Sequence, residues 1–119
     1  MIGTLRKIFK SFKYSANGIA FCLAKERNFR IHIIAAILVI GASLFFDFSS
    51  TQSAVLIITI FLVLIMEMFN TAIENLVNLV TEEYNELAKN VKDLSAGAVA
   101  LSALCAIIVG YFLFFGGKL

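Results

Sequence analysis

The sequence predicts an all-α integral membrane protein with one amphipathic surface helix and three membrane-spanning helices. Hydrophobic residues make up 61% of the 119 positions, whereas a soluble domain contains roughly 45–50%. Long apolar segments alternate with short charged segments along the chain. Seven of the ten Lys and Arg residues lie within the first thirty positions, although the net charge is only +2. This length allows one domain, which we expect to occupy residues 1–119.

The surface helix is predicted at about residues 4–24. Apolar residues such as Leu5, Ile8 and Phe12 recur at steps of three and four, and Lys and Arg occupy the opposite face. This pattern is typical of a helix that lies in the headgroup region, with its cations towards anionic lipid. The cations are too few and too interleaved with apolar residues for a nucleic-acid surface, so no nucleic-acid partner is expected. A cleavable signal peptide is not expected, because the first long apolar run begins after residue 30.

Three spans are predicted at about residues 31–47, 52–80 and 95–115. A crossing needs about 20 residues, so the second segment is long enough to cross the bilayer core and project beyond it. One of the hydroxyl residues at 49–51 is expected to cap this second helix. The third span contains no charged residue and begins with small residues that permit close helix packing.

The distribution of cations predicts the topology in the membrane. The surface helix and the polar stretch at 25–30 carry most of the Lys and Arg, so both are expected on the cytoplasmic side. The first loop is then external, the charged connector at 81–94 is cytoplasmic, and the C-terminal tail at 116–119 is external.

A polar stripe interrupts the second span near its cytoplasmic end. Glu67, Asn70, Glu74 and Asn78 fall within an arc of about 80° on a helix. Polar side chains at membrane depth are costly facing lipid, so the stripe should face protein, and an oligomer is the natural solution. Two carboxylates and two amides on one face could hold a divalent cation or handle a proton. The alternative is that they form interhelical hydrogen bonds that set the oligomer.

Two further charged clusters are expected at the same cytoplasmic level. Taken alone, each is typical of a solvated membrane interface, but three clusters at one depth indicate a shared polar site. The first cluster consists of Lys25, Glu26, Arg27, Arg30 and His32, and the second of Glu82, Glu83, Glu86, Lys89, Lys92 and Asp93. The two cysteines, Cys22 and Cys105, lack metal-ligand spacing and are interpreted as packing residues.

The run Glu67-Met-Phe-Asn70-Thr71-Ala72-Ile73-Glu74, with Lys92-Asp93 eighteen residues after Glu74, resembles the bacterial diacylglycerol kinase family. The resemblance extends over nearly the whole chain, from Tyr14-Ser15 to the small residues of the third span. The segment Asn-Phe-Arg-Ile-His at 28–32 looks most like the undecaprenol kinase branch found in Gram-positive bacteria. Asn78 and Asn85 depart from the Asp and His of other members, which puts their effect on nucleotide affinity in doubt.

The resemblance implies a homotrimer that transfers the γ-phosphate of ATP to a lipid hydroxyl at the cytoplasmic face, with Mg²⁺ as cofactor. It implies that Glu67 is the general base, and that Glu26 and Glu74 bind Mg²⁺. The implied nucleotide-contacting residues are Lys7, Lys10, Tyr14, Glu26, Glu74, Glu83, Tyr84, Asn85, Lys92 and Asp93. The implied lipid-contacting residues are Phe29, Arg30, Ile31, His32, Glu67 and Asn70.

The most specific expectation is that undecaprenol is phosphorylated to undecaprenyl phosphate, with diacylglycerol as the alternative substrate. A small proton-coupled exporter is the rival from another functional class. Such a protein would be expected to have four spans and a carboxylate near mid-membrane, whereas this chain has three predicted spans and its carboxylates lie towards one end.

Overall fold

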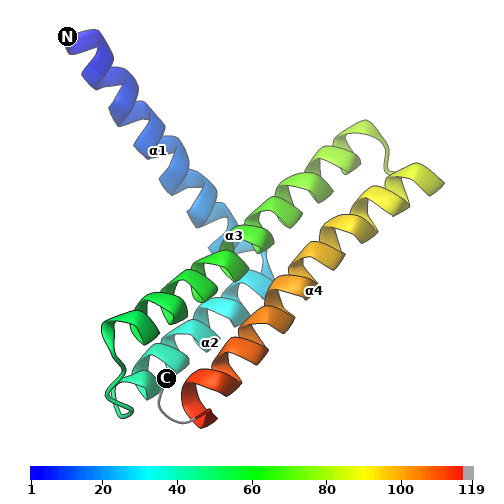
Figure 1. The fold of residues 1–119 in the computed structure, drawn as a ribbon. Helices are drawn as coiled ribbons and strands as arrows, with labels where there is room; N and C mark the ends of the chain where they lie inside the picture. Colours follow the sequence, from blue (N-terminus) through cyan, green and yellow to red (C-terminus); the bar gives the residue numbers. More distant parts are fainter. Residues whose placement is uncertain (117–119) are drawn as a thin grey trace.

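The computed structural model describes residues 1–116, and these residues form four α-helices joined by short links. The helices are α1 (Ile2–Lys25), α2 (Arg27–Ser43), α3 (Ser50–Val80) and α4 (Glu86–Phe115). Helices α2, α3 and α4 lie side by side, whereas α1 projects from them (Figure 1). The predicted all-α architecture is therefore confirmed.

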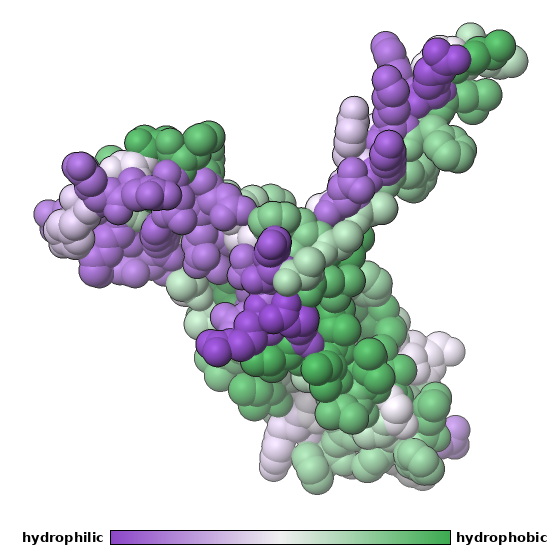
Figure 2. Space-filling view, turned by 180° about the vertical axis from the view of Figure 1, so that it is seen from behind, coloured by the Kyte–Doolittle hydropathy of each residue, from purple (hydrophilic) through white to green (hydrophobic). Residues whose placement is uncertain are grey.

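Helix α1 projects from the bundle and buries only one side chain, Cys22, near its end. Its remaining apolar residues form an exposed stripe along one face, and the opposite face is hydrophilic (Figure 2). Such a division suits a helix that lies at a membrane interface. Glu26, which has extended backbone angles (φ −109°, ψ 108°), ends α1 and allows the chain to turn directly into α2.

Helix α2 contains 17 residues, so the α-helical part of the predicted first span is short. Three backbone hydrogen bonds of the i→i−3 type continue the coil as a tighter turn, the last from Phe46 N–H to Ser43 C=O. Asp47 then adopts a positive φ of 52° and reverses the chain. The apolar segment thus ends where the sequence predicted, at Asp47, although its last turn is not α-helical.

Helices α3 and α4 are much longer and begin with side-chain caps. The Ser49 hydroxyl accepts from the Gln52 N–H, and the Gln52 side chain accepts from the Ser49 N–H, which completes a capping box. The Asn85 side chain accepts from the Ala88 N–H at the start of α4. Helix α4 therefore begins at Glu86, and most of the predicted connector at 81–94 is helical. The charged residues from Glu86 onwards lie on the first turns of α4.

The chain buries few apolar side chains of its own. Five of the ten buried residues in the described part are polar, and they all lie on α3 or α4: Thr59, Glu67, Thr71, Ser95 and Ser102. Large apolar side chains cover the outside of the bundle (Figure 2). This inverted distribution indicates that lipid or other subunits cover the bundle.

By length and composition, α3 and α4 could each cross a membrane. Their 31 and 30 residues correspond to about 45 Å, which exceeds a hydrocarbon core of about 30 Å. The excess length forms the hydrophilic end of the α3–α4 pair, which extends beyond α2 (Figures 1 and 2). The predicted external tail falls mostly outside the described residues.

Candidate active site

The polar residues gather where α1 ends, α2 begins and α3 passes its midpoint. Glu67 lies at this junction and is only 3% exposed. Its Oε1 lies 3.1 Å from Nε2 of His32, whose side chain is 27% exposed. The nearly buried carboxylate is thus paired with a residue that reaches the surface of the subunit.

Helix α1 contributes a thiol to the same junction. Burial raises the pKa of Cys22, and the negative charge of Glu26 adds to this effect. A hydrogen bond with the Thr71 side chain acts in the opposite direction, and Glu67 contributes a smaller upward effect. The site therefore favours a neutral thiol, in agreement with the interpretation of Cys22 as a packing residue.

Residues 29–32 share the first turns of α2 but have different environments. Phe29 is 2% exposed and packs within the subunit, whereas Ile31 is exposed. Arg30 donates from Nη1 to the carbonyl oxygens of Leu23 (3.0 Å) and Ala24 (3.1 Å). The guanidinium thereby satisfies two carbonyl groups at the C-terminal end of α1, where a cation is also favoured by the helix dipole. Arg30 consequently fixes the junction between α1 and α2.

The rest of the polar stripe faces α4; the helical arc predicted a shared face towards protein but not which helix it meets. Asn70 donates from Nδ2 to Oε1 of Glu74 (3.1 Å) and accepts at Oδ1 from the Ser95 hydroxyl (2.7 Å). Further along α3, Asn78 Oδ1 accepts from Lys92 Nζ at 2.7 Å. The stripe therefore makes interhelical hydrogen bonds within one subunit, and Asn70 holds the carboxylate of Glu74 in place.

The end of the α3–α4 pair carries the remaining predicted nucleotide residues of this region. Glu83, Tyr84 and Asn85 are exposed in the link between the helices, and Asn85 also caps α4. Asp93 pairs with Lys89 at 2.6 Å on the exposed side of α4.

Lys7, Lys10 and Tyr14 lie on the part of α1 that projects from the bundle, and all three are exposed. The structure of one subunit does not bring them together with the α3–α4 end (Figure 1). Any site that uses both groups would need a second subunit.

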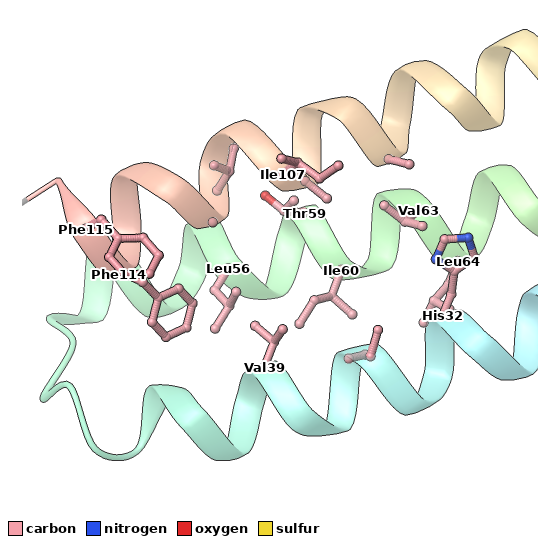
Figure 3. A pocket seen from close by; sticks show the side chains of 16 residues that line it. His32, Val39, Leu56, Thr59, Ile60, Val63, Leu64, Ile107, Phe114 and Phe115 are labelled. Carbon is pink, nitrogen blue, oxygen red and sulfur yellow. The ribbon is translucent and has the colours of Figure 1, made fainter.

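An apolar cavity of about 450 Å³ lies between α2, α3 and α4. His32 stands at one end, and Phe114 and Phe115 stand at the other (Figure 3). Thr59 also lines the cavity, but its hydroxyl donates to the Val55 carbonyl at 2.7 Å and is satisfied by its own helix. The cavity therefore offers an apolar interior that ends beside the His32–Glu67 pair.

Glu26 and Glu74, the predicted magnesium ligands, are not part of a closed metal site in the described residues. No three His, Cys, Asp or Glu side chains converge as a metal-binding group anywhere in residues 1–116. Glu26 is half-buried at the helix junction, and Glu74 is half-buried beside Asn70. Mg²⁺ usually takes one or two carboxylates together with water and substrate phosphates, so this donor chemistry suits Mg²⁺ bound with a nucleotide.

Sequence reasoning missed two partners of the site. Ser95 was assigned only to close helix packing, yet its hydroxyl joins α4 to Asn70. His32 was assigned to lipid contact, yet it is the partner of Glu67. The sequence offered one signal for Ser95, a small polar residue at the start of an apolar span. Its pairing with Asn70 could not be predicted, because it depends on how α3 and α4 are placed relative to each other.

Comparison with known proteins identifies the family of this chain. The sequence profile described as prokaryotic diacylglycerol kinase matches residues 13–114. A diacylglycerol kinase of Synechocystis is 46% identical over 101 residues, which cover 84% of this chain and 58% of that protein. An undecaprenol kinase of Bacillus subtilis is 36% identical over 110 residues (92% of this chain, 89% of that protein). A diacylglycerol kinase of Escherichia coli is 31% identical over 102 residues (86% and 84%).

This chain thus spans less than two thirds of the Synechocystis protein but most of the other two relatives. The profile match covers the helix junction, the polar stripe and nearly all of α4. The chain therefore belongs to the prokaryotic diacylglycerol kinase family of membrane lipid kinases.

Proposed function

We propose that this lipid kinase phosphorylates undecaprenol at the cytoplasmic face of the plasma membrane, with Glu67 as the general base. One observation carries the proposal: a nearly buried carboxylate is paired with the histidine that ends an apolar cavity. A lipid alcohol needs an apolar site for its chain and a proton acceptor for its hydroxyl. The pair and the cavity supply both within one subunit.

In the proposed reaction the hydroxyl oxygen of the lipid forms a bond to the γ-phosphorus of ATP. The bond between that phosphorus and the β,γ-bridging oxygen breaks, and ADP leaves with its electron pair. The proton of the lipid hydroxyl passes to the Glu67 carboxylate as the new bond forms. Phosphoryl transfer depends mainly on positioning and on neutralising phosphate charge, so one base beside a well-placed hydroxyl is sufficient.

Glu26 and Glu74 are proposed to hold Mg²⁺, which would neutralise phosphate charge when bound. Lys92 adds a cation on α4, held by Asn78 on the α3 side. Asn70 keeps the Glu74 carboxylate oriented through its amide. The proposed nucleotide site extends to Asp93 and to the exposed link at 83–85.

Three spans with a cytoplasmic N-terminus and a homotrimeric assembly complete the proposal. In this arrangement α2 and the tight turn that follows it form the first span, ahead of α3 and α4. The exposed apolar exterior of the bundle and the short apolar core support burial by lipid and neighbouring subunits. Assembly would allow Lys7, Lys10 and Tyr14 of one subunit to approach the nucleotide site of another.

Undecaprenol is preferred as the substrate because of the segment at 28–32, which ends with His32 beside the base. The relative named undecaprenol kinase also matches over 89% of its own length. The Synechocystis relative, named diacylglycerol kinase, has the higher identity, so diacylglycerol must be tested in parallel.

The experiment is a phosphorylation assay with purified protein in lipid vesicles, labelled ATP and Mg²⁺, using undecaprenol and diacylglycerol separately. We expect faster transfer to undecaprenol. Faster transfer to diacylglycerol would overturn the substrate proposal, and no transfer to either lipid would overturn the activity itself.

The base is tested by Glu67→Gln, which preserves side-chain size and an oxygen that accepts from His32. Loss of general-base catalysis should lower kcat by roughly 10²- to 10⁴-fold. Binding of a non-hydrolysable ATP analogue should remain close to that of the unmodified protein. A variant that keeps its kcat would exclude Glu67 as the base.

A further inference from the structure

The contact between His32 and Glu67 engages one oxygen of a nearly buried carboxylate. The side chain of Glu67 is 5% exposed, and among residues 1–116 His32 is its only ion-pair partner. His32 contacts Oε1, and no hydrogen bond from the described residues engages Oε2. His32 therefore contacts one oxygen of the carboxylate, and the other oxygen has no hydrogen-bond partner among the described residues.

The chemistry of the pair relates the position of one proton to the state of Glu67. An ionised carboxylate can only accept hydrogen bonds, so Nε2 of His32 is the donor when Glu67 is ionised. Nδ1 is then either a bare lone pair in the neutral ring or a second N–H in the imidazolium. The neutral ring is a plain donor to Oε1, whereas the imidazolium places a full positive charge against the carboxylate.

The titratable groups near the pair lie on α1 and at its link to α2. From α1 the neutral-favouring thiol of Cys22 faces the junction, and Glu26 lies at the link to α2. On α3 the polar residues that follow Glu67 most closely in the sequence are Asn70 and Thr71, and neither side chain titrates. From α4, Ser95 bonds to Asn70.

Among the described residues, no cation other than His32 lies within ion-pair distance of Glu67. Arg30 on α2 is bonded to the carbonyls of α1. On α4, Lys92 is bonded to Asn78, about three turns along α3 from Glu67, and Lys89 is bonded to Asp93. In the described part of the subunit, the imidazole is thus the one cationic group that can form directly against Glu67.

We propose that His32 is a positioning residue for phosphoryl transfer, which holds Oε1 of Glu67 through Nε2–H and aims Oε2 at the lipid hydroxyl. This rests on the proposed role of Glu67 as the base.

A spectroscopic test is possible because His32 is the only histidine in the chain. Protein labelled with ¹⁵N-histidine in lipid should give one set of ring signals, with Nε2 protonated in the neutral ring. Glu67→Gln should change the chemical shift of Nε2, because it replaces the carboxylate that this nitrogen contacts. A ring without a hydrogen on Nε2, or ring signals unchanged by Glu67→Gln, would overturn the pairing. This measurement needs no turnover, so it remains decisive even if the proposed activity fails.

The kinetic test uses His32→Ala, His32→Gln and a matched control, Ile34→Ala, which truncates an exposed residue of the same helix. Displacing a catalytic group by about 1 Å can cost about 10²-fold, so His32→Ala should lower kcat by about 10- to 100-fold. The KM values for ATP and lipid should change less than threefold, since the residue acts on the base. Ile34→Ala should retain kcat.

His32→Gln distinguishes positioning from a merely structural role. Its amide can donate to Oε1 but cannot become a cation, so kcat should recover to within about threefold of the unmodified protein. A glutamine variant as slow as His32→Ala would refute the proposal, and so would full activity in His32→Ala.

Discussion

Replacing Ser95 by alanine tests how α4 is fixed against the polar stripe of α3. Ser95 is 8% exposed, and its hydroxyl donates to Asn70 Oδ1 at 2.7 Å. Interhelical hydrogen bonds in membrane proteins contribute about 0.6 kcal/mol on average and at most about 1.7 kcal/mol. Loss of the donor also leaves the Asn70 oxygen without its partner, which can cost about 1–3 kcal/mol when the oxygen is buried. Because Asn70 is only half-buried, we expect Ser95→Ala to lower the free energy of unfolding by about 1 kcal/mol.

Ser102→Ala is the matched control on the same helix. Ser102 is 5% exposed, but its hydroxyl donates at 2.7 Å to the Val99 carbonyl of its own helix. That carbonyl also belongs to the helical hydrogen-bond pattern, so removing the hydroxyl leaves no group between the helices unpaired. We expect this variant to lose less than about 0.5 kcal/mol.

The two variants should also differ in nucleotide affinity. Ser95→Ala frees the Asn70 amide that orients Glu74. A loosening worth about 0.6 kcal/mol corresponds to roughly a threefold rise in KM for the magnesium–ATP complex, assuming that KM follows affinity. Ser102→Ala should leave this KM unchanged.

The assay is equilibrium unfolding in mixed micelles, performed on Ser95→Ala, Asn70→Ala and the double variant. A double-mutant cycle isolates the Ser95–Asn70 coupling from the separate loss of the bond between Asn70 and Glu74. Equal losses in Ser95→Ala and Ser102→Ala, or a coupling energy indistinguishable from zero, would refute the reasoning.

Three further substitutions test other parts of the structure. Lys92→Met should raise the KM for ATP roughly 10-fold or more, because a charged hydrogen bond to phosphate is lost. Lys89 is paired with Asp93 on the exposed side of α4, so Lys89→Met should change this KM less than threefold. Equal effects of the two substitutions would contradict the nucleotide site. Ser49→Ala removes half of a capping box and should cost about 1 kcal/mol in thermal or denaturant unfolding, so unchanged stability would show that the cap is dispensable. In a Cys105→Ala background, the rate of Cys22 alkylation should be low at neutral pH and rise only well above the ordinary thiol pKa of about 8.5, because the folded site raises the pKa of this thiol. Folding favours the neutral thiol, so this contribution to stability is complete below the ordinary thiol pKa and declines above it. Fast labelling at pH 7 would contradict the raised pKa.

Much of the architecture followed from local rules. The period of apolar residues predicted the surface helix and the apolar segments, and a hydroxyl residue at 49–51 was expected to cap α3, as Ser49 does. Helix boundaries were harder to predict where a helix begins with charged residues. Residues 86–93 were interpreted as a connector because they are charged, yet Asn85 caps a helix that starts at Glu86. Their charges are tolerated there because this end of the α3–α4 pair lies beyond the apolar body of the bundle (Figure 2).

In the candidate site, too, some features were predicted from the sequence and others were not. The arc of Glu67, Asn70, Glu74 and Asn78 predicted a single polar face, and the structure gives all four a polar partner. The rival interpretation as a proton-coupled exporter gives way to the kinase family, which the motif in this arc had indicated. The partners of these four residues could not be predicted from the sequence. A pairing between two helices depends on how each helix is rotated about its axis and shifted along it, and the sequence of one helix does not determine this.

The sequence by itself determined that this chain is helical, membrane-associated and polar along one face, because these properties follow from residue period and composition. Only the tertiary structure decided that Ser95 holds Asn70, that α1 leaves the bundle, and that the one histidine meets the buried glutamate. These features depend on contacts of about 3 Å between separate helices. A contact of that length is set by how whole helices pack, because a shift of one residue moves a side chain by about 100° around its axis.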